Sequence, residues 1–207
     1  MLAVLVGGLL SYWIAHVFSQ REERRKQIAA AHRLLFKIQR TTNDLVVYQR
    51  QIRQSMDEAG KAGIKGPVWT QILEFSGVEN RHFSPDGDEL SVLLVKQGHA
   101  LVNEICEIMD GHDAVTQSLC RLFTMKNDLG RELRPTMAGS VALIEVPTSD
   151  VGHLGPTFVM LDTLGNSIVA ALDTLVTQAK EVAAAYGLFI RKNYKISSFP
   201  ILVFPDQ

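Results

Sequence analysis

The sequence has few of the features by which disulfide-rich, nucleic-acid-binding or fibrous proteins are recognised. Its 207 residues include two cysteines, aromatic residues make up 7%, and 21 basic residues nearly cancel 22 acidic ones. Two thiols in a chain of this length do not form a disulfide framework. A net charge of −1 excludes a uniformly basic nucleic-acid binder. Glycine and proline are not enriched, which excludes collagen-like and low-complexity chains.

Common catalytic motifs are missing as well. The phosphate-binding G-x-x-x-x-G-K-[ST], the dinucleotide-binding G-x-G-x-x-G, the serine-hydrolase G-x-S-x-G and the zinc-protease H-E-x-x-H do not occur. Cys106, His112 and Cys120 are not spaced like zinc ligands. We therefore expect no enzymatic activity, no cofactor and no metal. An unrecognised carboxylate–histidine site at Glu104, Glu107 and His112 is the enzymatic alternative to an ordinary solvated helix face.

Residues 1–19 contain no Asp, Glu, Lys or Arg. A helix of about 20 residues spans about 30 Å, the thickness of the hydrocarbon core of a bilayer. No basic segment precedes this run and no small-residue cleavage site follows it, so a secretory signal peptide explains it less well. We predict a single transmembrane anchor at residues 1–20.

A basic cluster follows the anchor and predicts its orientation. The cluster consists of Arg21, Arg24, Arg25 and Lys26. Basic residues are retained on the cytoplasmic side, so we expect the N-terminus outside and residues 21–207 inside a cell (inner) membrane. With Trp13, the cluster is predicted to lie at the membrane interface, where each cation contributes about 1 kcal/mol near anionic lipid. Since lipid explains this charge, we expect no nucleic-acid partner.

Small residues recur every four positions within the anchor. They include Ala3, Gly7, Ser11 and Ala15. This spacing puts them on one stripe of a helix, and small side chains allow two membrane helices to approach closely. The stripe predicts self-association into a homo-oligomer. The alternative is that small residues are simply frequent in membrane helices.

The remainder of the chain predicts an all-α fold. The anchor is expected to run into a basic, coiled-coil-like neck helix at residues 21–60, followed by a small antiparallel helical bundle at 61–190 that packs with the neck. Apolar residues from Ile28 to Met56 follow a heptad seam, which indicates packing either between chains or, because the apolar face is broad, within the chain.

Local signals set the expected helix boundaries in the body. Asp86 and Glu89 form a capping box at the start of a helix. The sequence Asp-Gly-His-Asp at 110–113 predicts a break, and Pro156 predicts the start of a long helix to Ile190. The apolar run at 141–146 has no evident partner strand and is interpreted as an ordered loop.

Residues 191–207 are predicted to form an extended basic and apolar tail. Phe199, Ile201, Leu202 and Phe204 are its candidate partner-docking residues, and the alternative is that the tail folds back and caps the bundle. Together these features predict a membrane-anchored cytoplasmic interaction module that self-associates and engages an unknown protein. Such a module is a scaffold, an accessory subunit or a signal-relay component. Two alternatives to this module are the enzyme described above and an oligomerising membrane effector.

Overall fold

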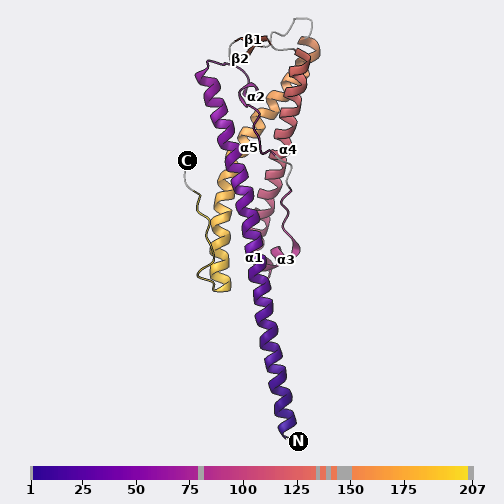
Figure 1. The fold of residues 1–207 in the computed structure, drawn as a ribbon, viewed down its shortest axis with the longest axis vertical. Helices are drawn as coiled ribbons and strands as arrows, with labels where there is room; N and C mark the ends of the chain where they lie inside the picture. The colour runs from indigo at the N-terminus through magenta and orange to yellow at the C-terminus, as the bar shows by residue number, and fades with distance from the viewer. Residues whose placement is uncertain (1, 79–81, 134–135, 139–140, 144–150, 205–207) are drawn as a thin grey trace. The chain divides into compact units, whose positions relative to one another are not determined.

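The predicted helical bundle is confirmed in the computed structural model of the chain (Figure 1). The model describes the backbone of residues 2–78, 82–133, 136–138, 141–143 and 151–204, and the side chains of 12–78, 82–133 and 152–204. Its elements are α1 (Leu2–Lys61), α2 (Val68–Gln71), α3 (Gly87–Leu94), α4 (His99–Leu133), β1 (Thr136–Ala138), β2 (Val141–Leu143) and α5 (Val151–Tyr194).

The chain is organised as two compact units, each assembled from segments that are distant in sequence. Unit 1 consists of residues 1–40, 84–106 and 182–207, and unit 2 of residues 41–83 and 107–181. The three long helices α1, α4 and α5 each contribute residues to both units. Each unit has a core of its own.

The core of unit 1 is built around two aromatic rings, Tyr186 of α5 and Phe199 of the tail. Both are buried, and their ring centroids lie 6.1 Å apart in an edge-on arrangement. The Tyr186 hydroxyl donates a hydrogen bond to the Ala31 carbonyl of α1 at 2.8 Å, so its polar atom is satisfied inside the core. The centre of the His32 ring of α1 lies 4.7 Å from the centre of the Phe199 ring. The tail therefore packs against α1 and α5.

The core of unit 2 joins α2 to α4 and α5. The backbone of Trp69 in α2 approaches α5 so closely that a Cβ on Gly165 would lie 3.1 Å from its nitrogen. Lys126 of α4 donates to the carbonyls of Trp69 and Ile72. Burial lowers the pKa of the Lys126 ammonium, although the charge of Glu74 opposes the shift. These contacts tie the short α2 segment to the long helices.

The heptad seam of α1 is buried within the chain itself. Its buried members are Ala31, Leu35, Ile38, Thr42, Leu45 and Ile52. Leu34, Thr41, Tyr48 and Ser55 are buried beside them, which makes the face as broad as a bundle helix requires. Of the two alternatives, packing within the chain is the one observed.

The predicted break at residues 110–113 is wrong, because α4 continues through it to Leu133. Gly111 serves close packing instead, since a Cβ there would lie 2.6 Å from a methyl group of Leu175. The chain breaks earlier, between α3 and α4. Gln97 adopts a left-handed conformation with φ of 61°, and the amide of Gly98 bonds to the carbonyl of Leu93 at 2.9 Å. This is a Schellman cap, in which a non-glycine residue takes the left-handed position.

The interpretation of the run from Val141 as an unpaired loop is also wrong. Residues Val141–Leu143 form β2, which pairs antiparallel with β1, so that Thr136 lies opposite Leu143. Residues 144–146 of the run lie outside the described residues. The next helix, α5, begins at Val151 rather than Pro156 and ends at Tyr194 rather than Ile190. Pro156 lies inside α5, one turn after its start, where it cannot donate the backbone hydrogen bond that the carbonyl of Gly152 would accept.

Among the described residues, α5 is the helix whose length and composition would allow it to cross a membrane. Its exposed positions are mixed, because Asn166 and Asp173 are exposed on it and so are Val159 and Leu188. The Asp173 carboxylate accepts a hydrogen bond from Arg53 at 2.8 Å and another from Gln49 at 2.7 Å. Leu161 and Ile168 are buried on the packed face of α5, as expected of a helix in a bundle.

Replacing Gly187 with alanine tests the docking of the tail. A Cβ at Gly187 would lie 2.7 Å from the carbonyl oxygen of Pro200, so the tail backbone must shift. We expect Gly187→Ala to lower the free energy of unfolding by about 1–3 kcal/mol, measured by denaturant titration of the full chain in detergent. Gly87→Ala is the matched control in unit 1, since a Cβ there meets nothing within 4 Å. Equal effects of the two substitutions would refute the tail packing.

Candidate functional site

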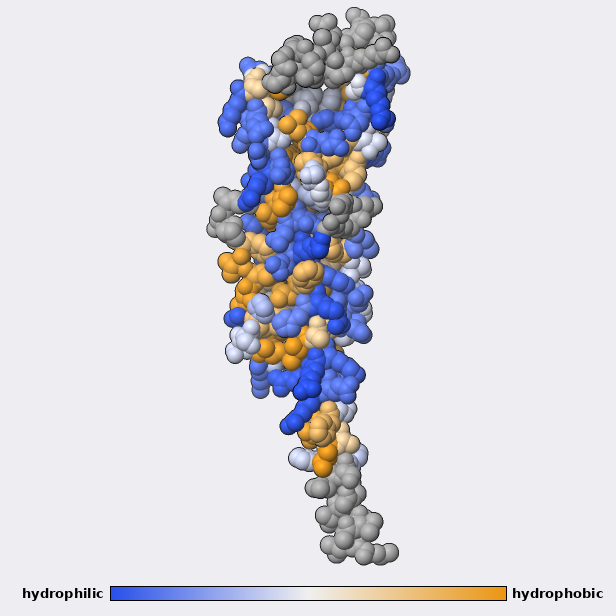
Figure 2. All heavy atoms as spheres, in the orientation of Figure 1, coloured by the Kyte–Doolittle hydropathy of each residue, from blue (hydrophilic) through white to orange (hydrophobic). Residues whose placement is uncertain are grey.

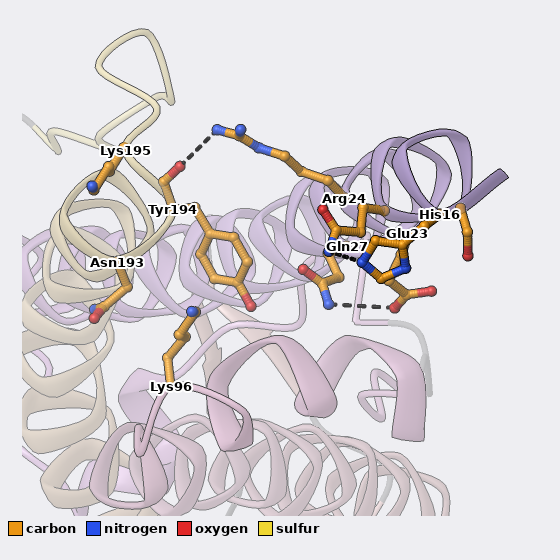
Figure 3. A pocket seen from close by; sticks show the side chains of 10 residues that line it. His16, Glu23, Arg24, Gln27, Lys96, Asn193, Tyr194 and Lys195 are labelled. Carbon is orange, nitrogen blue, oxygen red and sulfur yellow. Dashed lines mark hydrogen bonds between the residues drawn. The ribbon is translucent and has the colours of Figure 1, made fainter. Parts of the chain in front are cut away.

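A cleft of about 480 Å³ lies in unit 1, where α1 runs beside the end of α5 and the turn between α3 and α4 (Figure 3). It is lined by His16, Ser19, Gln20, Glu23, Arg24, Gln27, Lys96, Asn193, Tyr194 and Lys195. Every lining side chain is polar, and three are cationic at neutral pH. This composition suits an anionic ligand better than an apolar one.

One wall of the cleft is a single face of α1. His16, Gln20, Glu23 and Gln27 are spaced by three or four residues, which places them in one row along the helix. Neighbours in this row interact: Gln20 contacts the His16 ring at 2.9 Å, and Gln27 donates to Glu23 at 3.3 Å. Figure 3 shows His16, Glu23 and Gln27 of this row on one side of the opening and Tyr194 on the other.

The opposite wall comes from the last turn of α5. The Tyr194 hydroxyl donates to the Val92 carbonyl of α3 at 2.7 Å, which fixes the end of α5 against α3. The Tyr194 carbonyl accepts a hydrogen bond from Arg24 of α1 at 3.2 Å (Figure 3). Lys195 then turns out of the helix with a φ of 53°. The side chain of Asn193 lies on the same wall.

Lys96 reaches the cleft because the Schellman cap reverses the chain immediately after α3. Its ammonium lies 5.7 Å above the centre of the Tyr194 ring. Gly98 lets this turn approach α5, since a Cβ there would lie 2.8 Å from the Phe189 ring. The position of Lys96 thus depends on a left-handed residue, a glycine and an aromatic contact rather than on a regular helix.

A buried carboxylate holds α3 against α1. Glu89 is 0% exposed, and it accepts hydrogen bonds from the Asp86 amide and the Lys37 ammonium, each at 2.9 Å. Burial disfavours the charged form of Lys37, but its hydrogen bonds to Glu89 and Asp86 outweigh that effect and raise its pKa. The second Glu89 oxygen lies 3.6 Å from Arg33 and has no hydrogen bond. The predicted capping box is therefore present, with an ion pair added to it.

The predicted membrane-interface residues divide into two groups. Arg24 lines the cleft, whereas Arg21, Arg25 and Lys26 are exposed on α1. Lys26 pairs with Glu22 at 3.1 Å. Trp13 is 63% exposed, one turn before His16.

The predicted self-association stripe is described only in part. Ala3, Gly7 and Ser11 belong to α1, but their side chains lie outside the described residues. Ala15 is exposed, so its part of the stripe is not covered within the chain.

The residues of the enzymatic alternative do not converge. Glu104 and Glu107 are exposed, while His112 is fully buried. Five residues along α4 turn the helix by about 140°, so Glu107 and His112 do not share a face. The His112 ring lies instead between two carboxylates, with Nδ1 at 3.2 Å from Asp113 and Nε2 at 3.7 Å from Asp44. Among the described residues, no group of His, Cys, Asp or Glu side chains is placed to hold a metal ion.

The predicted docking residues of the tail differ in exposure. Phe199 is buried and is not presented to a partner. Ile201, Leu202 and Phe204 are partly exposed, and docking through them remains a prediction. Lys96, Tyr194 and Lys195 were not predicted from the sequence as members of one site. The one sequence signal for this turn was Gly98, two residues after Lys96, because glycine is frequent where a helix ends.

Comparisons with protein-family models, with curated proteins and with solved structures found no match.

Replacing Lys37 with methionine tests the buried ion pair. The substitution leaves the Glu89 carboxylate buried without its ammonium partner, and we expect the free energy of unfolding to fall by about 3 kcal/mol. Adding Glu89→Gln removes the stranded charge and should recover part of the loss. Lys26→Met, at the exposed pair with Glu22 on the same helix, should cost less than about 0.5 kcal/mol in the same denaturant titration. Equal losses for Lys37→Met and Lys26→Met would contradict the assignment.

Proposed function

We propose that the protein is a membrane-anchored, cytoplasmic helical interaction module, with residues 1–20 as its transmembrane anchor. In this role it is a scaffold, an accessory subunit or a signal-relay component rather than an enzyme. The anchor holds it at the inner membrane with the N-terminus outside, and residues 21–207 lie in the cytoplasm.

The observation that carries the proposal is an apolar stretch of α1 that the chain leaves uncovered. Trp13 is 63% exposed and Phe18 is 64% exposed, although both are large and apolar. Upstream of them the sequence is free of charged side chains back to Met1. Lipid is the medium that would cover such a surface, and aromatic rings favour the membrane interface.

Two further features support the anchor. A backbone inside a bilayer must satisfy its hydrogen bonds internally, and residues 2–20 belong to one unbroken helix, α1. On the face drawn in Figure 2, hydrophilic side chains predominate on α1 near the rest of unit 1, and apolar side chains follow toward the N-terminus. This order of hydrophilic and then apolar side chains along α1 is expected of a helix that passes from water into lipid.

The proposed partner role follows from charge and from the absence of a convergent catalytic site among the described residues. The chain from residue 67 to 190 carries 16 acidic and 7 basic residues, in contrast to the basic neck. An acidic surface in the cytoplasm suits a basic protein partner and disfavours nucleic acid.

Membrane fractionation with protease protection tests the proposed function. We expect the full chain in the membrane fraction after high-salt and alkaline washes, because a spanning helix is not held by charge alone. In sealed inner-membrane vesicles with the cytoplasmic face outward, added protease should digest residues 21–207 and leave the anchor protected. Replacing Leu9 with arginine should reduce insertion, whereas replacing Gln20 with arginine should not. Recovery of the unchanged chain in the soluble fraction would overturn the proposal.

Self-association through the anchor is tested by substitution on and off the small-residue stripe. Gly7→Leu combined with Ser11→Leu should weaken crosslinking between chains in the membrane by about fivefold, because the two backbones no longer approach closely. Gly8→Leu, one position off the stripe, is the matched control and should leave crosslinking unchanged. If both variants crosslink like the unchanged chain, the stripe is incidental.

A further inference from the structure

The cleft in unit 1 contains positive charge that unit 1 does not neutralise. Within the described part of the chain, Lys96 and Lys195 form no ion pair with a carboxylate. Lys37, in contrast, pairs with Asp86 and Glu89. Two ammonium groups without a carboxylate partner, one from the α3–α4 turn and one from the residue after α5, line the same cleft and favour an anionic ligand.

The cleft begins where the proposed anchor ends. His16, Ser19 and Gln20 belong to the last turns of the anchor, and Glu23 to Gln27 continue the same wall. The headgroup region extends about 5–8 Å beyond the hydrocarbon edge, so at 1.5 Å per residue it covers residues 20–25 of α1. Because Lys96 and Lys195 lie beside this part of α1, they are at the same depth.

The turn that carries Lys96 also has the surface of a membrane-contacting segment. Leu94 and Val95 precede it and are exposed, Val95 by 63%. Apolar side chains followed by a lysine allow the chain to dip into the interface while the ammonium remains at the level of the phosphates.

We propose that this cleft binds the headgroup of an anionic phospholipid. Lys96 and Lys195 pair with the lipid phosphate, and Ser19 and Asn193 supply hydrogen bonds. Glu23 lies on the opposite wall, where it repels a bare phosphate and accepts hydrogen bonds from headgroup hydroxyls. The site therefore favours a hydroxyl-bearing headgroup such as phosphatidylglycerol over inorganic phosphate. This inference rests on the proposed anchor.

Native mass spectrometry of the full chain in detergent micelles tests the site, with phosphatidylglycerol and phosphatidylcholine as the probes. We expect retention of phosphatidylglycerol to exceed that of phosphatidylcholine. Lys96→Gln combined with Lys195→Gln should reduce retention of phosphatidylglycerol by about tenfold, as expected for the loss of two cations near a phosphate. Circular dichroism and thermal unfolding establish that each variant is folded.

Two single substitutions distinguish a built site from bulk positive charge. Lys192→Gln removes an exposed lysine of the same helix turn that does not line the cleft, and it should change retention by less than about twofold. Glu23→Gln should raise binding of inorganic phosphate, measured as competition with the bound lipid, because it removes the repelling carboxylate.

The possible results distinguish failure of the proposed lipid site from failure of the proposed membrane anchor. Equal losses in the Lys192 variant and in the cleft variant would overturn the cleft as a lipid site, and so would equal retention of both lipids. Competition by inorganic phosphate as strong as by phosphatidylglycerol would assign the cleft to free phosphate instead. Membrane-inserted protein without lipid preference would refute this inference alone, while soluble protein in the fractionation would refute the proposed function itself.

Discussion

The buried carboxylate of Glu89 is the contact on which the arrangement of unit 1 depends. A charged group without exposure must be paired, and Glu89 finds the Asp86 amide within its own helix start and the Lys37 ammonium on α1. The same group therefore caps α3 and fastens it to α1. Once α3 is fixed, the turn that follows it lies beside the part of α1 nearest the proposed membrane.

Hydrogen bonds and aromatic contacts also hold α5 and the tail in unit 1. Tyr194 bonds to the carbonyl of Val92 in α3, and Tyr186 bonds to the carbonyl of Ala31 in α1. Phe199 fills the remaining space against Tyr186. Each of these aromatic contacts brings a segment from one region of the sequence onto another, so the cleft is a product of the packed core rather than of a local motif.

The sequence alone predicted what depends on neighbouring residues. The capping box of Asp86 and Glu89, the end of α1 near Gly60 and the helical character of the body all rest on short-range patterns. The break after α3 was missed, because glutamine is an unusual residue for a left-handed position. The helix through Gly111 was missed too, because the glycine is there to accommodate Leu175 from another helix.

The candidate site could not be assembled from the sequence for a related reason. Arg24 was assigned to the membrane interface, but Lys96 and Lys195 are 72 and 171 residues further along the chain. Their convergence requires the Glu89 ion pair and the Tyr194 hydrogen bond, neither of which has a sequence signature. For Phe199 the sequence left two alternatives open, docking to a partner or folding back onto the bundle. Its burial depends on contacts with α1 and α5, and α1 is distant in sequence from the tail.

The most direct test of the account is the depth of the α3–α4 turn in a bilayer. A spin label at Val95→Cys, with Cys106 and Cys120 replaced by alanine, reports whether the base of unit 1 contacts lipid. The account predicts that oxygen relaxes this label more strongly than a water-soluble nickel chelate does, as at Phe18→Cys. A label at the exposed Gln39, about 28 Å beyond the anchor along α1, should show the opposite preference. A Val95 label that behaves like the Gln39 label would contradict the placement of unit 1 at the membrane surface.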